Sequence, residues 1–375
     1  MEEWKEYKLG DVCSRLRSGK GIKADSVFNS GKYPVIGGNG VRGYADVPNF
    51  EGQAAIIGRQ GAYCGNVRFF EGEAYMTEHA IVAVGNELAD TRFLACLLSL
   101  MHLGNLSAQS AQPGISVQTL SKQPIRLPSI SYQKKVSAII KSLDDKIEVN
   151  RRINDNLEQQ AQALFKSWFV DFEPFKDSEF EETEFGLIPR GWKVVSLSVI
   201  ADYINGLAMQ KYRPIEGEKG LPVLKIKELG QGSTDDYSEL CSPSLIGEKY
   251  IIDDGDIIFS WSGTLMVKVW CGGKCGLNQH LFVVEPKDYP HWFAYQWTKH
   301  HLDNFIHIAK DKAVTMGHIK RGELDKAKVV VPDGTSMAAI DSMMKPLHSQ
   351  IISNKIESRR LASMRDTILP RLMSG

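Results

Sequence analysis

A regular apolar stripe between residues 136 and 168 constrains this chain more than any other feature. Its members step by four and three residues in alternation, which keeps one seam of a helix facing a partner helix. The stripe is Val136, Ile140, Leu143, Ile147, Asn150, Asn154, Leu157, Ala161, Leu164 and Trp168. The spacing predicts a long helix, from about residue 132 to residue 171, that takes part in a coiled coil.

A second stripe with the same steps lies at the C-terminal end of the chain. Each of its members lies 204 positions after its counterpart in the first stripe, as Asn354 does after Asn150. The stripe is Ile340, Met344, Leu347, Ile351, Asn354, Ser358, Leu361, Arg365, Ile368 and Leu372. The constant offset indicates a tandem duplication. We expect the two helices to pair with each other; the alternative is that each packs only on its own globular domain.

The asparagines at the same position of both stripes predict a fixed register. A buried seam amide is costly unless it meets a partner, so Asn150 and Asn354 favour one alignment of the two helices over all others.

The bulk composition is that of a soluble globular protein. With 375 residues, 43% hydrophobic and 24% charged, the chain has room for two or three domains. Residues 1–8 are charged and aromatic, and no apolar run approaches the ~20 residues that span a bilayer. We therefore expect a cytoplasmic protein with no membrane partner.

Six scattered cysteines predict free thiols rather than a disulfide framework. They are Cys13, Cys64, Cys96, Cys241, Cys271 and Cys275. Cys271 and Cys275 are close to each other and to His280, but a single C-x3-C pair is a weak zinc signal. We expect no metal site.

The formal net charge is zero, which counts against a generic nucleic-acid binder. The charge is unevenly distributed, however. Acidic residues crowd the segment 173–184, so the remainder of the chain is net basic.

Pattern changes along the chain predict five parts: a first domain (1–128), a central helix (129–172), an acidic linker (173–190), a second domain (191–333) and a C-terminal helix (334–375). Strands are expected at 33–36, 54–57, 80–84 and 123–128, a helix at 92–102, and a polar loop at 109–116. The first domain is therefore α+β. Trp4 and Trp192, His79 and His280, and Pro128 and Pro332 occupy corresponding places in the two halves. The loops between them have diverged, which indicates a rigid frame with two variable surfaces.

A glycine motif, G-x-G-x-x-G at residues 38–43, raises the possibility of a dinucleotide site. That motif functions only when it opens a helix, and an extended or turn-like segment follows here. We interpret it instead as a loop that exposes backbone amides and Asn39, Arg42 and Tyr44. Motifs of P-loop enzymes, nucleases, amino-methyltransferases and nucleophile-elbow hydrolases are missing from the sequence. We expect neither a catalytic centre nor a cofactor.

Side chains suited to reading DNA gather at equivalent places in the two halves. Arginine suits guanine, glutamine and asparagine suit adenine, and lysine neutralises phosphates. The candidates in the first half are Asn39, Arg42, Tyr44, Arg59, Gln60, Tyr63, Asn66, Arg68, Gln109 and Gln112. The candidates in the second half are Lys211, Tyr212, Lys225, Lys227, Trp261, Ser262, Lys268, Gln279, Lys310, Lys312, Thr315 and His318. The alternative for each is an ordinary solvated loop residue. For His79 and His280, which flank apolar strands, a hydrogen-bonded core role is favoured over DNA contact.

Several segments resemble the DNA-specificity (S) subunits of type I restriction-modification systems. They are residues 33–39, 157–169, 191–192, 206–209, 221–227 and 368–372, and the resemblance covers essentially the whole chain. It implies two α/β target-recognition domains held apart by an antiparallel coiled coil of two conserved helices, with an internal pseudo-two-fold repeat. It also implies a non-catalytic protein that binds a bipartite, gapped site in double-stranded DNA. Two methyltransferase subunits, and through them restriction (motor and nuclease) subunits, are the implied protein partners. The neutral net charge departs from what strong DNA binding by the isolated subunit requires.

The helices are expected to serve as both spacer and docking surface. The seam from residue 136 to residue 168 measures roughly 48 Å at about 1.5 Å per residue, which is close to one helical turn of DNA or slightly more. The residues expected in the coiled coil or at a partner are Ile140, Leu143, Ile147, Asn150, Leu157, Leu164, Phe165, Trp168, Phe169, Leu347, Ile351, Asn354, Leu361, Ile368 and Leu372. The cluster of Leu164, Phe165, Trp168 and Phe169 is more apolar than a helix pair requires, so part of it is expected to contact a methyltransferase subunit.

Two other functions remain open from the sequence. One is a self-contained nuclease or methyltransferase, and the other is a pseudo-symmetric protein that binds peptides or proteins rather than DNA.

Overall fold

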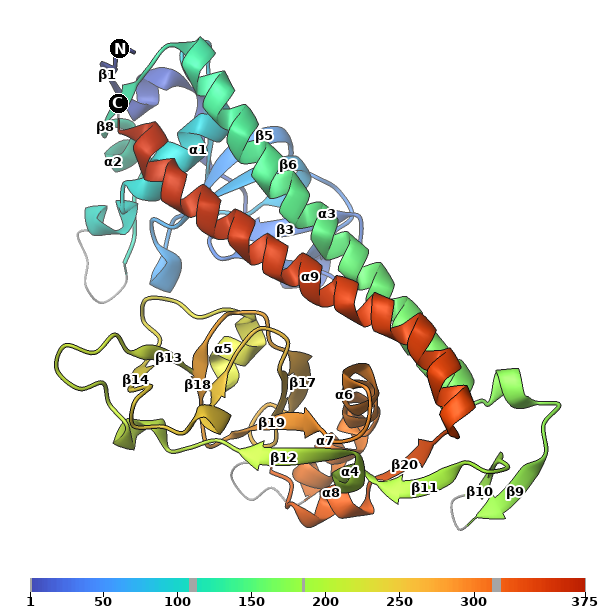
Figure 1. Cartoon of the computed structure of the whole chain (residues 1–375). Helices are drawn as coiled ribbons and strands as arrows, with labels where there is room; N and C mark the ends of the chain where they lie inside the picture. The colour runs from blue at the N-terminus through green and yellow to red at the C-terminus, as the bar shows by residue number, and fades with distance from the viewer. Residues whose placement is uncertain (1, 108–112, 184–185, 312–317, 375) are drawn as a thin grey trace. The chain divides into compact units, whose positions relative to one another are not determined.

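The computed structural model describes residues 2–107, 113–183, 186–311 and 318–374 (Figure 1). The chain divides into two compact units. Unit 1 comprises residues 1–145 and 362–375, and unit 2 comprises residues 146–361.

Unit 1 is built on a six-stranded sheet of order β2-β7-β5-β6-β3-β4. Its strands are β2 (Cys13–Ser18), β3 (Tyr33–Gly37), β4 (Gly40–Ala45), β5 (Phe50–Gly58), β6 (Val67–Met76) and β7 (Ala80–Gly85). β3 runs parallel to β6, with Val35 opposite Tyr75, and the other neighbouring strands are antiparallel. A separate pair, β1 (Lys5–Lys8) with β8 (Pro124–Leu127), joins the start of the unit to its last strand.

Both faces of this sheet are covered, which explains the uninterrupted apolar runs of β5 and β7. Side chains alternate between the faces of a strand. Ile57 and Ile81 therefore enter the core beneath helix α1 (Thr91–Leu100), whereas Ile56 and Val82 enter a second core on the other face. Asp90 caps α1 by accepting a hydrogen bond from the Phe93 amide (3.0 Å). The strands and the helix predicted from the sequence in this region are confirmed, although α1 ends two residues early.

Shorter elements complete unit 1. They are the helix α2 (Val117–Ser121) and the 3-10 turns η1 (Leu9–Val12), η2 (Ala24–Ser26), η3 (Gly61–Tyr63) and η4 (Leu103–Leu106).

Unit 2 repeats this strand order with shorter strands. Its main sheet has the order β12-β19-β16-β17, in which the four strands correspond to β2, β7, β5 and β6. A second sheet, β14-β13-β18-β15, contains a parallel pairing of β13 with β18, as β3 pairs with β6 in unit 1. β11 pairs with β20 as β1 does with β8. The strands are β11 (Lys193–Ser196), β12 (Ala201–Asn205), β13 (Leu221–Leu224), β14 (Leu240–Cys241), β15 (Ile251–Ile252), β16 (Ile257–Ser260), β17 (Met266–Val269), β18 (Cys275–Leu277), β19 (Leu281–Pro286) and β20 (Lys328–Val331).

Helices and a hairpin surround these two sheets. The helices are α4 (Leu197–Ile200), α5 (Ile226–Gln231), α6 (His291–His300), α7 (Leu302–Asp311) and α8 (Gly322–Lys326), and the 3-10 turns are η5 (Glu173–Phe175), η6 (Met209–Lys211) and η7 (Glu248–Tyr250). The acidic segment before β11 carries the hairpin of β9 (Phe180–Thr183) and β10 (Gly186–Pro189). Phe172 and Phe175 of this segment pack edge-on against Trp192.

Two helices of 40 residues each, α3 (Ile130–Phe169) and α9 (Gly334–Met373), account for the two sequence stripes. Each begins after a proline and a polar capping side chain. Ser129 Oγ accepts a hydrogen bond from the Tyr132 amide (3.3 Å). Asp333 Oδ1 accepts hydrogen bonds from the amides of Thr335 and Ser336, and bonds from Ser336 above all lower the pKa of that carboxyl. The predicted long helix at residues 132–171 is confirmed to within two residues at each end.

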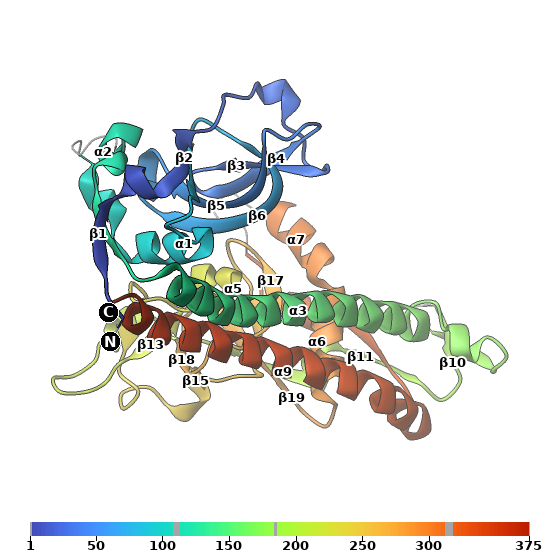
Figure 2. The same cartoon turned by 90° about the horizontal axis from the view of Figure 1, so that it is seen from above.

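Within each unit the segments of α3 and α9 lie side by side and run in opposite directions (Figure 2). In unit 2, Asn150 Nδ2 donates to Glu357 Oε2 (2.7 Å), Asn354 Nδ2 donates to Asn154 Oδ1 (2.9 Å), and Asn154 Nδ2 donates to the Ile351 carbonyl (3.2 Å). In unit 1, Tyr132 Oη donates to the Leu372 carbonyl (3.4 Å). The seam asparagines thus bond across from one helix to the other.

The aromatic end of α3 is buried inside unit 2. Phe165 and Phe169 are only 5% and 3% exposed, and both rings contact Trp297. Leu164 and Trp168 are half-buried against the same core. The prediction that part of this cluster contacts a methyltransferase subunit is therefore wrong for Phe165 and Phe169, because the aromatic side chains of the chain's own second domain cover them. For Leu164 and Trp168 it stays a prediction.

We expect Phe169→Ala to lower the free energy of unfolding of the chain by about 3–5 kcal/mol, because it leaves a cavity among packed aromatic rings. The matched control is Ile153→Ala on the same helix, where the side chain is 41% exposed. Urea denaturation of the full chain measures both. Equal losses for the two variants would contradict the burial described here.

Candidate nucleic-acid interface

Three loops of unit 1 converge at one end of its sheet. The turn between β3 and β4 approaches so closely that a Cβ on Gly38 would lie 3.0 Å from the His79 carbonyl and 3.2 Å from Gly58 Cα. The Arg59 amide donates to the His79 carbonyl (2.9 Å), and the Ile115 amide donates to the Arg59 carbonyl (2.9 Å). The β3–β4 turn, the β5–β6 connection and the β6–β7 turn therefore form one continuous surface.

Most of the first-half candidates lie at this loop end: Asn39, Arg59, Gln60, Tyr63, Asn66 and Arg68. Arg68 Nη1 donates to the Asn39 carbonyl (2.8 Å), which braces the β3–β4 turn. Arg42 is exposed on β4 and makes no ion pair with the residues that the structure describes. Tyr44 lies at the opposite end of β4, bridged to Phe28, so the structure does not bring it to the loop end.

The glycine motif at residues 38–43 forms the hairpin between β3 and β4 rather than the start of a helix. A dinucleotide site of the G-x-G-x-x-G type is thereby excluded. Asn39 is exposed in the turn between the two strands, whereas Arg42 and Tyr44 lie on β4 rather than in a loop.

The corresponding loops of unit 2 converge in the same way but carry different chemistry. Trp261 Nε1 donates to Asn205 Oδ1 (2.9 Å), which links the ends of β16 and β12. Ser262 Oγ lies 3.1 Å from His280 Nδ1, which links the end of β16 to the turn before β19. The Ile319 amide donates to the Trp261 carbonyl (3.1 Å) and Ser262 bridges to His318. Among the second-half candidates, Trp261, Ser262, Gln279 and His318 are brought together here.

One position is occupied by equivalent pairs in the two units. In unit 1 Glu78 Oε1 lies 3.3 Å from His79 Nε2, and in unit 2 Gln279 Nε2 lies 3.3 Å from His280 Nε2. Both histidines are half-buried and neither lies in a core: the side chain of His79 is 43% exposed and pairs with Glu78, and His280 is held by contacts with Ser262 and Gln279. Their hydrogen bonds agree with the expectation, but their burial is less than a core role requires. Asn205 lies at the loop surface of unit 2 and was not among the candidates from the sequence. Glu78 lies at the loop surface of unit 1, next to His79.

Three lysines of the second half are held by neighbours, and two of them, Lys225 and Lys227, are neutralised by carboxylates. Lys225 pairs with Glu239 (3.1 Å) and Lys227 with Asp235 (3.2 Å), and these hydrogen bonds lower the pKa of both carboxyls. Lys268 Nζ donates to the Gly230 carbonyl (2.7 Å), and burial lowers its pKa.

The remaining candidates have simple placements. Lys211 ends η6, and the Tyr212 carbonyl accepts a hydrogen bond from the Ser242 amide. Lys310 is exposed near the end of α7. Gln109, Gln112, Lys312 and Thr315 lie outside the described residues.

The cysteine pair shows the chemistry of core thiols rather than of metal ligands. Cys271 and Cys275 are buried and free, and burial raises the pKa of their thiols to about 11 and about 12. Zinc binds the thiolate, which such burial disfavours. Over the described ranges, no helix is sufficiently long and apolar to cross a membrane.

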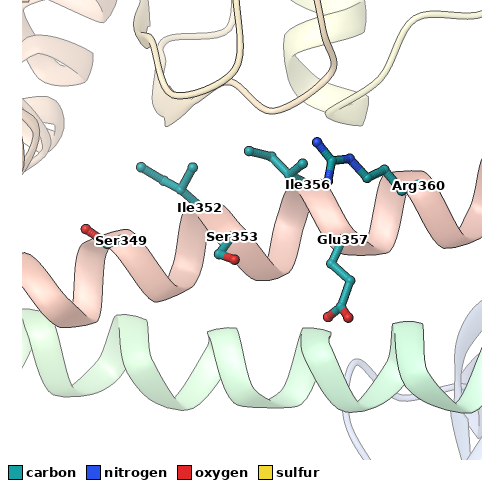
Figure 3. Close-up of a pocket in the computed structure, with 6 residues that line it drawn as sticks. All are labelled: Ser349, Ile352, Ser353, Ile356, Glu357 and Arg360. Atoms are coloured by element: carbon teal, nitrogen blue, oxygen red, sulfur yellow. The ribbon is translucent and has the colours of Figure 1, made fainter.

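A groove of about 610 Å³ runs along α9 in unit 2 and is lined by Ser349, Ile352, Ser353, Ile356, Glu357 and Arg360. Figure 3 shows Ile352 and Ile356 on the side of α9 that points away from α3, whereas Glu357 points toward α3. The groove is open and lies on one helix, so it offers few converging polar groups for a small ligand.

The model of one protein family, described as "Type I restriction modification DNA specificity domain", matches the chain twice, over residues 1–159 and 189–358. The chain belongs to this family. Each match covers one set of converging loops together with most of one long helix. Membership of a family of specificity subunits agrees with the prediction that the chain is not itself an enzyme.

Three relatives are similar to this chain over alignments of different length and identity. The MjaIX type I specificity subunit of Methanocaldococcus jannaschii is 29% identical over 73% of this chain and 65% of its own length. The EcoprrI specificity subunit of Escherichia coli is 36% identical over 38% of this chain and 36% of its own length. The chain thus spans less than two thirds of these two relatives. The HindI specificity subunit of Haemophilus influenzae aligns over the whole of both chains at 23% identity.

A solved structure supports the fold. The type I restriction-modification S subunit from M. genitalium superposes with a TM-score of 0.60 at 16% identity, covering 100% of this chain and 97% of that one. At this level of identity the similarity concerns the architecture.

The salt dependence of DNA binding should separate free from neutralised cations. We expect Arg42→Ala to lower the slope of log affinity against log salt by about 1, because one phosphate contact is lost. Lys227→Ala should leave the slope unchanged, since Asp235 already neutralises that ammonium group. Duplex binding by the full chain, titrated at several salt concentrations, measures both. A larger effect of Lys227→Ala than of Arg42→Ala would show that the surface that carries Lys225 and Lys227 contacts DNA.

Proposed function

We propose that this chain is the DNA-recognition subunit of a type I restriction-modification complex and reads a bipartite, gapped site in double-stranded DNA. The observation that carries the proposal is the occurrence of the same converging loop surface in both units, each within one match to the specificity-domain family. Two loop surfaces with different side chains suit two different short sequences, each read through base edges.

The domain organisation fits this proposal. Residues 1–128 and 191–333 form the two recognition domains, residues 129–172 and 334–375 the two helices, and residues 173–190 the acidic connection. We infer that the halves arose by duplication and that α3 and α9 form an antiparallel coiled coil with a pseudo-two-fold repeat. The equivalent strand orders and the bonds between seam asparagines support both inferences.

The different chemistry of the two loop surfaces suits different bases. Unit 1 offers Arg59, whose guanidinium group suits guanine O6 and N7, while Arg68 supports the turn that carries Asn39. Unit 2 offers Gln279, whose amide suits adenine N6 and N7, at the same loop end as Trp261.

Methylation mapping tests the proposal. The full chain is co-expressed with its methyltransferase partner in a host without other modification systems, and the modified genomic positions are determined. We expect a split motif with a fixed gap that appears only when this chain is present. Exchange of residues 1–128 for those of a relative should change one half of the motif and leave the other unchanged.

The two other functions predict different outcomes of the same experiment. Methylation or cleavage by the purified chain alone would indicate a self-contained enzyme. A stable complex whose methylation pattern does not depend on this chain would indicate a protein-binding role instead.

We also propose that the methyltransferase subunit binds the exposed face of α3 in unit 2. Val149 and Ile153 lie one helical turn apart, and their side chains are 48% and 41% exposed. Exposed apolar pairs on a helix suit a protein interface better than water. We propose this contact instead of one through Phe165 and Phe169, which are buried.

Charge placed on this face should prevent assembly. We expect Val149→Asp with Ile153→Asp to abolish co-purification of the methyltransferase, with little change in the melting temperature of the chain. Ile215→Asp, at a side chain 54% exposed outside the helices, is the control and should co-purify normally. Undiminished co-purification of the double variant would place the contact elsewhere.

A further inference from the structure

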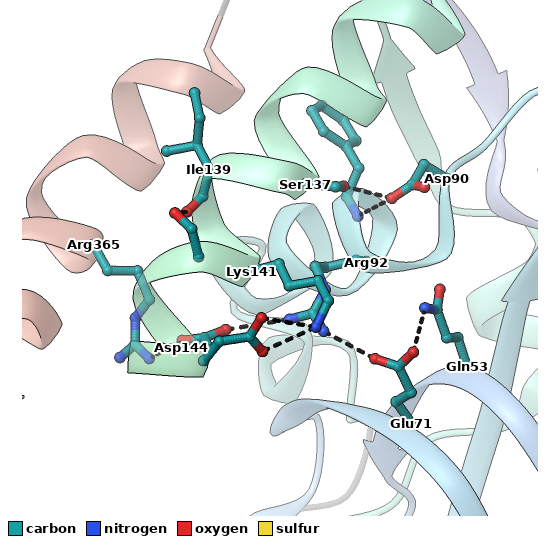
Figure 4. A network of polar contacts seen from close by, with 12 residues as sticks. Gln53, Glu71, Asp90, Arg92, Ser137, Ile139, Lys141, Asp144 and Arg365 are labelled. Atoms are coloured by element: carbon teal, nitrogen blue, oxygen red, sulfur yellow. Dashed lines mark hydrogen bonds and ion pairs between the residues drawn. The ribbon is translucent and has the colours of Figure 1, made fainter. Parts of the chain in front are cut away.

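A chain of alternating charges crosses unit 1 from its recognition sheet to both long helices. Arg92, near the start of α1, lies at its centre with a side chain only 9% exposed. Its Nη2 bonds to Glu71 Oε2 on β6 and its Nη1 to Asp144 Oδ2 on α3, each at 3.3 Å. Asp144 Oδ1 in turn accepts a hydrogen bond from Arg365 Nη1 on α9 (2.9 Å). Figure 4 shows these side chains meeting between the sheet and the helices.

Each member of this network is fixed by a second contact. The Arg92 guanidinium carbon lies 3.8 Å from the centre of the Phe69 ring, so the plane of the group is set by stacking. Glu71 Oε1 accepts a hydrogen bond from Gln53 on β5 (2.9 Å). The guanidinium therefore has one orientation in which both its acidic partners are satisfied.

Unit 2 makes the same kind of connection with the charges exchanged, because here the arginine lies on the helix and the carboxylate in the domain. Arg359 on α9 donates through both terminal nitrogens to the two oxygens of Asp254, each at 2.6 Å, and its Nη1 also donates to the Cys271 carbonyl (2.8 Å). Asp254 lies in the turn between β15 and β16, and Asp254 Oδ1 also accepts from the Gly273 amide (2.8 Å). A bidentate arginine thus ties a recognition domain to its helix in this unit too.

Apolar packing alone would leave the angle between sheet and helix loosely defined, because it is non-directional. Charged, forked hydrogen bonds are directional and specify one arrangement. Since the proposed function requires two loop surfaces to meet two sequences at once, the angle of each domain on its helices would affect the spacing that is read, in addition to the length of the helices.

We propose that Arg92 and Arg359 are positioning residues that set the length of the gap in the DNA site, acting through the domain angle and not through contact with bases. This proposal rests on the proposed function. In this proposal the two arginines restrict how far the gap length can vary, and the loop surfaces determine which bases are recognised.

The test uses the full chain in its methyltransferase complex and a DNA library in which the wild-type half-sites are separated by gaps of varied length. Arg92→Met keeps the stem and removes the charge, and Arg359→Met does the same in unit 2. We expect both variants to methylate sites with gaps one base pair shorter and longer, in addition to the wild-type gap, with both half-site sequences unchanged. Arg92→Lys should restore the single gap at least in part, since it returns the charge.

The matched control is Arg190→Met before β11, where an exposed guanidinium pairs with Glu179. It should keep the single gap. Asp144→Asn provides a second, isosteric variant of the unit 1 network in case Arg92→Met does not fold.

Each outcome has a distinct meaning. If the Arg92, Asp144 and Arg359 variants lose thermal stability but retain the single wild-type gap, the residues are merely structural and the proposal is wrong. If their base preferences change instead of the gap, they act on reading and the proposal is also wrong. If the wild-type complex methylates no split motif at all, the proposed function itself is overturned, and the gap role with it.

Discussion

Sharing of each long helix between two hydrophobic cores is the constraint on which the rest of this structure depends. Val136 and Ile140 of α3 are buried in the core of unit 1, whereas Phe165 and Phe169 are buried in that of unit 2. α9 does the reverse, with Ile340 in unit 2 and Met373 in unit 1. Neither unit has a closed core without these helices. Movement of a helix segment therefore acts on the sheet that it covers, so the helices are structural parts of both units.

The long helices and the first-domain strands were predictable because their signals are local. The spacing of the stripes determines both helices, and the polar side chain just before each one, Ser129 or Asp333, marks where it starts. Strand order was not predicted, because pairings such as Val35 with Tyr75 join positions far apart in sequence. The same limit explains the error over Phe165 and Phe169. Nothing near them in sequence shows that Trp192 and Trp297 gather around the end of α3.

The sequence predicted which residue types occur in the candidate interface, but not which of their charged groups are free to contact DNA. Loops rich in Arg, Gln and Asn lie together at one end of the unit 1 sheet. That this end contacts DNA stays a prediction. Lys225 and Lys227 carry the same charge in the sequence as Arg42, yet the fold supplies each with an acidic neighbour. Whether a positively charged side chain is free to bind phosphate depends on such acidic neighbours, and residue spacing in the sequence does not predict them. Tyr44 was grouped with the loop residues because the sequence does not show which end of β4 lies near the loops. The direction of the hairpin decides this.

The terminal strand pairs of the two domains have a consequence for changes of length within each domain. β1 pairs with β8 and β11 with β20, so the chain enters and leaves each domain through neighbouring strands. The distance between the two ends of the intervening segment is therefore set by this pairing and not by the length of the segment. An insertion or a deletion inside a domain would then leave the ends of the flanking helices in place.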